Sequence, residues 1–316
     1  MKKLAIGIDI GGTNASFGFV STEGKVLNKK SYPIKNFKTA KSFVDFTSKE
    51  IANSVSNLNS SYEISGIGIG APNGNFYTGA IEFAPNLEWN GFIPLASMFH
   101  ESTGYKSFLT NDANAAAIGE MVYGDAKDLK NFVMITLGTG VGSGFVANGE
   151  LILGYDGFAG ELGHTIFDPN GRQCNCGRCG CVETYASATG IVRTAKEFLT
   201  KFNEKSLLHN ADLDKLSSKD IYNAALQKDK IALKVFDYTG YVLGFSLANA
   251  IAITSPEAIF LFGGLANAGD LIFRPTKKYM EKYLLNIFKN KVELRKSGLP
   301  ENDAAIIGAA ALVWDH

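Results

Sequence analysis

Two stretches of the sequence match without gaps: Gly12-Thr13-Asn14-Ala15-Ser16-Phe17-Gly18-Phe19-Val20 and Gly138-Thr139-Gly140-Val141-Gly142-Ser143-Gly144-Phe145-Val146. Five of the nine positions are identical, at a constant offset of 126. Each copy follows an apolar strand and precedes a turn and another apolar pair. Chance similarity between two glycine-rich hairpins is the alternative, but the shared order of elements favours a duplicated domain, since repeats reuse one supersecondary unit.

The length agrees with a chain of two domains. At ~150 residues per domain, 316 residues suggest about two. We place the boundary near residues 124–130, which gives an N-terminal α/β domain over 1–124 and a C-terminal α/β domain over 125–316. In the first domain, short strands up to residue 34 precede a helix over 39–56, strands over 64–69 and 106–109, and a helix over 113–121. This order predicts a mixed sheet with helices on its faces.

Composition excludes several classes of protein. The 31 basic and 31 acidic residues balance, so no global field attracts nucleic acid or an anionic membrane. Residues 238–254 carry no charge, but their polar and glycine residues indicate a buried core helix instead of a membrane span. Asp9 interrupts the apolar start of the chain, which argues against a signal peptide. We therefore expect a cytoplasmic protein.

Glycine-rich turns suggest phosphate binding. Turns that leave an apolar strand present backbone N–H groups in concave arrays that bind phosphate oxygens. Ordinary hairpin turns are the alternative, but two matched turns and a third pair after a strand favour a nucleotide site. The residues concerned are Gly11, Gly12 and Thr13, then Gly138, Thr139 and Gly140, then Gly263 and Gly264.

Two aspartates lie where chemistry is expected. Asp9 breaks an apolar strand beside the first turn, where a water-bridged Mg²⁺ is a natural partner for a carboxylate that is costly to bury alone. A hydrogen bond to the Gly11–Gly12 turn is the structural alternative. Asp112 ends a strand and begins a helix, a position that faces the ligand crevice of open α/β sheets. It is either a general base for a hydroxyl proton or merely the N-cap of the helix.

The four cysteines form the most specific local signal. They lie within residues 174–181, after Gly163-His164 and before Glu183, in the pattern C-x-C-G-x-C-G-C-x-E. Clustered thiols with a nearby histidine are typical of a tetrahedral structural zinc site. Five side chains compete for four places, and spacing alone does not choose among His164, Cys174, Cys176, Cys179 and Cys181.

These motifs together resemble the ROK family of sugar kinases, which also includes transcriptional repressors. Asp9-Ile10-Gly11-Gly12-Thr13 and residues 137–142 resemble its two phosphate motifs, and Gly263-Gly264 its adenosine motif. Asn111-Asp112-Ala113-Asn114 and residues 160–164 resemble its sugar-site segments, and residues 174–183 its cysteine signature. The motifs stand in family order from Asp9 to Gly264.

The resemblance implies an actin-like ATPase (ribonuclease H-like) fold, with two domains around a cleft and a zinc-knuckle insertion. It implies ATP and Mg²⁺ acting on the 6-hydroxyl of a hexose, with Asp112 as general base. The other sugar contacts implied are Asn86, Asn111, Glu161, His164 and Glu183. The zinc ligands implied are His164, Cys174, Cys176 and Cys181. Cys179 departs from the usual pattern, so a ligand exchange or a spare thiol stays open. A homodimer is also implied.

Several hypotheses about the function remain open at this point. Glucose is our expected substrate, because Glu161, His164 and Glu183 together look like the glucokinase-type arrangement. N-acetylmannosamine, N-acetylglucosamine, fructose and allose are alternatives within the family. A non-catalytic sugar sensor is disfavoured by the intact Asp9, Asp112 and both loops. A DNA-binding repressor is disfavoured by the zero net charge and by a first strand that starts at Leu4, which leaves no room for a helix-turn-helix.

Overall fold

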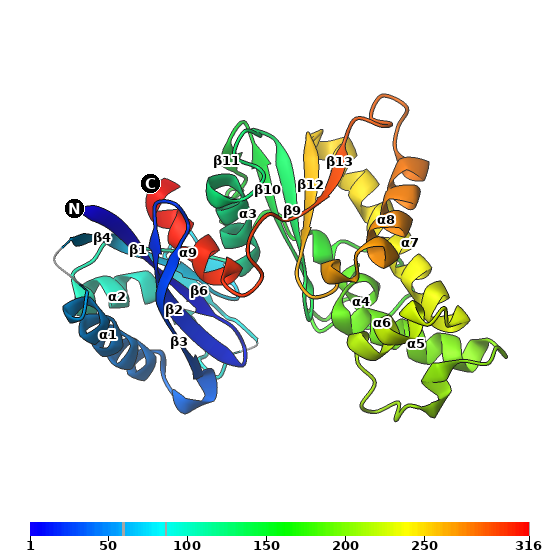
Figure 1. The fold of residues 1–316 in the computed structure, drawn as a ribbon, viewed down its shortest axis with the longest axis horizontal. Coiled ribbons are helices and arrows are strands. Elements are labelled where there is room, and N and C mark those ends of the chain that lie inside the picture. Colours follow the sequence, from blue (N-terminus) through cyan, green and yellow to red (C-terminus); the bar gives the residue numbers. More distant parts are fainter. Residues whose placement is uncertain (59–60, 86, 316) are drawn as a thin grey trace. The chain divides into compact units, whose positions relative to one another are not determined.

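The computed structural model describes residues 1–58, 61–85 and 87–315, and the chain divides into two compact units. The first comprises residues 1–129, 150–159 and 298–316, and the second comprises 130–149 and 160–297. Figure 1 follows the chain by colour through both units. We expected the second domain to run to residue 316, but residues 298–316 belong to the first unit because the last helix packs on its sheet.

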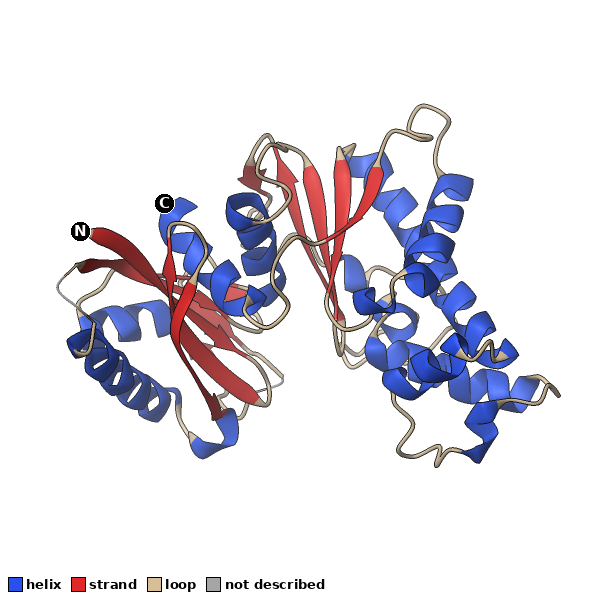
Figure 2. Ribbon diagram, viewed as in Figure 1, coloured by secondary structure: helices blue, strands red, loops and turns tan. Residues whose placement is uncertain are grey.

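The first unit is built on a five-stranded mixed sheet of order β3-β2-β1-β4-β8 (Figure 2). The strands are β1 (Lys2–Ile10), β2 (Asn14–Ser21), β3 (Val26–Pro33), β4 (Tyr62–Gly70) and β8 (Ser107–Thr110). The hairpins β1–β2 and β2–β3 are antiparallel, whereas β1–β4 and β4–β8 are parallel. A small separate sheet joins β5 (Gly74–Asn75), β6 (Ala80–Glu82) and β7 (Phe92–Ile93).

Helices cover both faces of this sheet. They are α1 (Ala40–Ser56), α2 (Leu95–Thr103), α3 (Asp112–Tyr123) and α9 (Ala304–Asp315). The predicted helix over 39–56 is confirmed, with Thr39 as its N-cap in a capping box. Alternate residues of β1 such as Ile6 and Ile8 share a buried cluster with Phe43 of α1 and Phe99 of α2.

The opposite face of β1 and β4 is lined with glycine where α9 crosses it. A Cβ at Gly7 would overlap the backbone oxygen of Ile306, and one at Gly68 would overlap that of Ala309. The alternating Gly-Ile pattern of residues 66–70 is therefore a strand against a closely packed helix. The glycines of this stretch do not form a dinucleotide-binding turn, because no helix begins directly after Gly70.

The second unit repeats the same topology. Its strands are β9 (Phe132–Leu137), β10 (Val141–Ala147), β12 (Ala258–Phe262) and β13 (Glu293–Lys296), in the order β10-β9-β12-β13; the chain continues from β10 into β11 (Glu150–Leu151). Antiparallel β9–β10 corresponds to β1–β2, and parallel β9–β12 and β12–β13 correspond to β1–β4 and β4–β8. The pairing pattern supports the duplication that the repeated hairpin predicts.

The helices of the second unit surround a separate apolar core. They are α4 (Glu183–Ala186), α5 (Ala188–Lys201), α6 (Ser218–Leu226), α7 (Lys230–Thr254) and α8 (Asp270–Tyr283). Short 3₁₀ turns of this unit are η2 (Leu162–His164), η3 (Leu207–Asn210) and η4 (Ala266–Ala268), whereas η1 (Ile34–Asn36) belongs to the first unit. The uncharged stretch 238–254 lies in α7, whose buried residues join this core, so the expected core helix is confirmed. Among the described helices, none is long and apolar enough to cross a membrane.

Candidate active site and metal centre

The parallel strands of the first unit bring its predicted site residues to one edge. Asp9 in β1 pairs with Gly70 in β4, and Gly70 pairs with Thr110 in β8. Asp112 follows Thr110 by two residues, so both aspartates lie at the carboxyl edge of the sheet. Ligands of open α/β sheets bind at this edge. The first glycine turn leaves the same edge, with the Gly11 N–H bonded to the Asn14 carbonyl at 2.9 Å.

The cap of helix α3 belongs to Asn111, not to Asp112. The Asn111 Oδ1 accepts the N–H of Asn114 at 2.6 Å, whereas Asp112 is the first helical residue and its Oδ1 accepts the adjacent Ala113 N–H at 2.8 Å. The N-cap alternative for Asp112 is therefore wrong. The residue is exposed at the surface, but desolvation of its carboxyl by the surrounding protein raises its pKa above the ordinary value.

The surroundings of Asp9 are unfavourable for a negative charge. Burial raises the pKa of its carboxyl to about 6, the negative charge of Asp112 adds to the rise, and Lys29 opposes it. The two carboxylates therefore lie at the same edge of the sheet with charges of the same sign. A site with two interacting carboxylates attracts a divalent cation, which would relieve both charges.

In the second unit, two glycine turns lie side by side. Phe262 at the end of β12 pairs with Thr136 near the end of the parallel strand β9. Gly263 has φ +99°, and a Cβ there would lie 2.7 Å from the Leu137 backbone oxygen, so only glycine suits the position. Gly138 and Gly264 are exposed at the same carboxyl edge. The predicted second phosphate turn and the predicted adenosine turn therefore lie next to each other.

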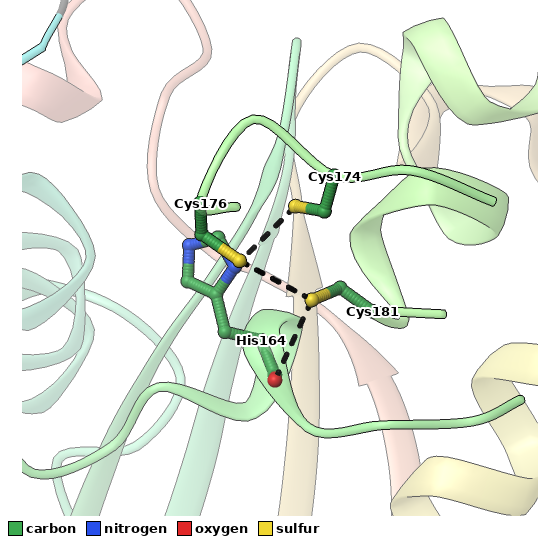
Figure 3. Close-up of side chains that lie close together, drawn as sticks. All are labelled: His164, Cys174, Cys176 and Cys181. Atoms are coloured by element: carbon green, nitrogen blue, oxygen red, sulfur yellow. Dashed lines mark hydrogen bonds between the residues drawn. The ribbon is translucent and has the colours of Figure 1, made fainter. Parts of the chain in front are cut away.

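His164, Cys174, Cys176 and Cys181 converge into a cluster, shown in Figure 3. Their candidate ligand atoms all lie within 4.8 Å of one another. The Cys174 Sγ lies 3.8 Å from the His164 Nδ1, and the Cys176 Sγ lies 3.5 Å from the Cys181 Sγ. Cys179 stays outside this set and contacts the Gln173 Oε1 at 3.2 Å. Among the described residues, the four that converge are those implied by the family resemblance.

The donor set fits zinc. Three thiols and one imidazole are a usual combination for structural Zn²⁺, and Zn–S bonds of about 2.3 Å place tetrahedral ligand atoms roughly 3.8 Å apart. The separations of 3.5 and 3.8 Å are close to that value. Glycines shape the loop, because a Cβ at Gly180 would overlap the backbone oxygen of Asp168. These separations between ligand atoms suit tetrahedral coordination of a cation.

Glu183 and Glu161 differ in what they contact. Glu183 begins α4, and its Oε2 accepts the N–H of Val141 at 3.2 Å. Its Oε1 lies 3.4 Å from the Cys174 Sγ and 3.9 Å from the His164 Nδ1. Glu161 is exposed just before η2, and its carbonyl accepts the His164 N–H. Asn86, the remaining predicted sugar contact, lies outside the described residues.

The contacts that support these segments were not predicted from the sequence. Ser143 accepts the Leu162 N–H at 3.0 Å and donates to the Gly160 carbonyl, which ties the histidine segment to β10. A Cβ at Gly163 would overlap the Val141 backbone oxygen. Gly163 was visible as a motif glycine, but no local pattern identifies its neighbour across the fold.

Comparisons with known proteins agree with this arrangement. The ROK family profile matches residues 5–316. The chain belongs to the ROK family. It is 40% identical to a glucokinase of Halalkalibacterium halodurans, covering 98% of this chain and 94% of that one, and 36% identical to a glucokinase of Thermotoga maritima, covering 100% and 99%.

A solved ROK family structure gives a similar result. The glucokinase of Streptomyces griseus, in complex with glucose and AMPPNP, shares 32% identity and superimposes with a TM-score of 0.81, covering 99% of this chain and 100% of that chain. The mixed α/β sheets described above are thus those of a ROK family sugar kinase.

Proposed function

We propose that the protein is an ATP-dependent glucokinase that phosphorylates the 6-hydroxyl of glucose. The observation that carries the proposal is Asp112. It lies at the carboxyl edge of the first sheet and is exposed. Its side chain does not cap helix α3, because Asn111 is the N-cap. The glucokinase relatives over the full length of the chain support glucose as the substrate, and the glucokinase structure in complex with glucose and AMPPNP supports ATP as the donor.

Asp112 acts as the general base in this proposal. A carboxylate that accepts the hydroxyl proton during attack contributes typically 10²–10⁴-fold in rate. Its raised pKa makes it a better proton acceptor than an ordinary aspartate. Asn86, Asn111, Glu161, His164 and Glu183 are the proposed partners of the other sugar hydroxyls.

The glycine turns supply the remaining requirements of phosphoryl transfer, which are alignment and neutralisation of charge. The proposed ATP contacts are Gly11, Gly12, Thr13, Gly138, Thr139, Gly140, Gly263 and Gly264. We propose that Asp9 holds the Mg²⁺ of the nucleotide through water. His164, Cys174, Cys176 and Cys181 would hold a structural zinc ion, which stabilises the loop that carries the sugar contacts.

The finer features of the proposal follow from family membership. They are the duplicated actin-like ATPase fold with a zinc knuckle, a homodimer, and a cytoplasmic location in carbohydrate metabolism. N-acetylmannosamine, N-acetylglucosamine and fructose are the alternative acceptors, which differ from glucose at positions that the pocket would contact.

The test is release of ADP from Mg-ATP with a panel of hexoses and N-acetylhexosamines. Asp112→Asn should lower kcat by 10²–10⁴-fold with a normal far-UV circular dichroism spectrum. Asp45→Asn, an exposed change on α1, serves as the control and should keep the full rate. A preferred acetylated sugar would overturn glucose but keep the kinase; no ADP above background with any sugar in zinc-loaded protein would overturn the kinase.

A further inference from the structure

The carboxylate of Glu183 lies between the second glycine turn and the metal cluster. One oxygen, Oε2, accepts the Val141 N–H at 3.2 Å, where β10 leaves the turn. The other oxygen, Oε1, lies 3.4 Å from the Cys174 Sγ and 3.9 Å from the His164 Nδ1. A single side chain therefore contacts the phosphate turn on one side and two candidate metal ligands on the other.

The residues that follow Glu183 support the rest of the same turn. The Ala188 N–H donates to the Gly138 carbonyl at 2.9 Å, and the Thr189 hydroxyl donates to the Thr139 carbonyl at 2.9 Å. These bonds occupy the turn's carbonyl groups. The segment 183–189, which directly follows the last cysteine, thus supports Gly138, Thr139 and Val141.

A second contact runs from the histidine side of the cluster. Gly163, the neighbour of His164, packs so tightly on the Val141 backbone oxygen that no Cβ could be accommodated. Val141 is consequently packed against the histidine segment on the side of its oxygen, and its N–H is bonded to Glu183. Both supports come from residues next to candidate metal ligands.

We propose that Glu183 is a positioning residue for nucleotide binding, and that metal occupancy of the cluster raises the affinity for ATP through it. The inference rests on the proposed kinase function. A cation bound by His164 and the three cysteines would fix the histidine segment next to Gly163 and the segment that runs from Cys181 to Glu183, so that Oε2 keeps the Val141 N–H and the turn keeps its phosphate-binding shape. A carboxylate has about four lone-pair sites, so the same group can still accept a sugar hydroxyl.

The experiment measures the Kd of Mg-AMPPNP by calorimetry without sugar, and the zinc content by metal analysis. Glu183→Gln should retain zinc, since Glu183 is not a ligand, but should bind Mg-AMPPNP about tenfold more weakly, as expected from loss of one charge-assisted hydrogen bond. Glu197→Gln is the matched control: Glu197 is an exposed carboxylate in the same unit that pairs with Arg172. Its Kd should equal that of the unaltered protein.

Linkage supplies a second readout. Coupling between two sites is reciprocal, so saturating Mg-AMPPNP should raise the affinity for Zn²⁺, measured by competition with a chromogenic chelator. In Glu183→Gln this increase should disappear. The competition uses folded, zinc-loaded protein, and circular dichroism records that the fold is kept.

The possible outcomes separate the two proposals. If the unaltered protein binds no Mg-AMPPNP, the kinase proposal fails. If it binds Mg-AMPPNP and Glu183→Gln binds equally well with an unchanged zinc linkage, only the positioning role fails. Loss of zinc from Glu183→Gln would also overturn this role, because Glu183 would then belong to the metal site itself.

Discussion

At the residue scale, Asp9 illustrates a conflict between stability and function. Its pKa of about 6 in the folded protein, against an ordinary 3.8, means that folding favours the protonated form. The free energy of unfolding should therefore decline as the pH rises through about 6, because the folded state must then carry an unfavourable charge. The charge is the feature that makes Asp9 a candidate magnesium ligand.

Replacing this charge should stabilise the protein while impairing it. Asp9→Asn should raise the melting temperature above that of the unaltered protein at pH 7.5 without magnesium or nucleotide. The difference should shrink as the pH falls below 6, and Mg-ATP turnover should be strongly reduced at any pH. Melts at several pH values check this, with exposed Asp45→Asn as control. A constant difference across the pH range would contradict the titration of Asp9.

At the element scale, the packing of α9 on the first sheet depends on glycines in β1 and β4. Gly68→Ala should destabilise the protein by roughly 2–3 kcal/mol, because the new methyl group overlaps the Ala309 backbone and the helix has to move. Gly70→Ala is the matched control in the same strand, where the nearest atom to a new Cβ is the Ala115 Cβ at 3.4 Å, an ordinary contact. Urea unfolding measures both; equal losses would contradict the packing argument.

The elements themselves were largely predictable, whereas the partners that join them were not. Apolar runs and glycine turns located β1, β4, β9 and β12, and the repeated hairpin predicted the shared topology. The return of 298–316 to the first unit was not predicted, because the apolar sequence of α9 contains nothing about which sheet the helix covers. The N-cap of α3 was one of two alternatives for Asp112 and proved to be Asn111, since both residue types are good caps and only the backbone decides.

The candidate site divides in the same way. Residues that belong to a known motif, such as His164 and the cysteines, were predictable as candidate metal ligands. The structure shows that Cys179 is the cysteine outside the cluster. The link from Glu183 to Val141 spans 42 residues. Such a contact depends on the packing of η2 and α4 on β10, which local periodicity does not contain.

At the scale of the whole molecule, the chain leaves the first unit after residue 129, returns briefly at 150–159, and returns finally at 298. The segment before the first departure and the segment after the final return both contact the same fully buried carboxylate. Glu120 accepts the N–H of Asp125 at 2.9 Å and that of Gly298 at 2.9 Å. Buried acceptors of this kind are costly to lose, because the two donors are left without water.

Glu120→Gln should lower the free energy of unfolding by about 1–3 kcal/mol, since a neutral amide is a weaker acceptor and adds unwanted donors. It should also speed tryptic cleavage at Lys127 and Lys130. Glu257→Gln is the control, because Glu257 likewise accepts two backbone N–H groups, those of Lys130 and Asn131, but is exposed, so water can replace it. If Glu120→Gln and the control lose the same stability, burial is not the cause.

The two units also have separate cores, and the chain offers a way to follow them individually. Both tryptophans, Trp89 and Trp314, lie in the first unit, whereas the metal cluster lies in the second. Metal binding to folded ligands contributes directly to the stability of the part that holds it. Removing zinc should therefore lower the midpoint of the far-UV circular dichroism melt, which reports both units, by several degrees. The midpoint of the tryptophan fluorescence melt should change much less.

Cys176→Ser should reproduce the effect of zinc removal, and Cys179→Ser should not, because Cys179 contacts Gln173 outside the cluster. Equal shifts of the two midpoints would mean that the two units unfold cooperatively, so that loss of the metal destabilises both of them.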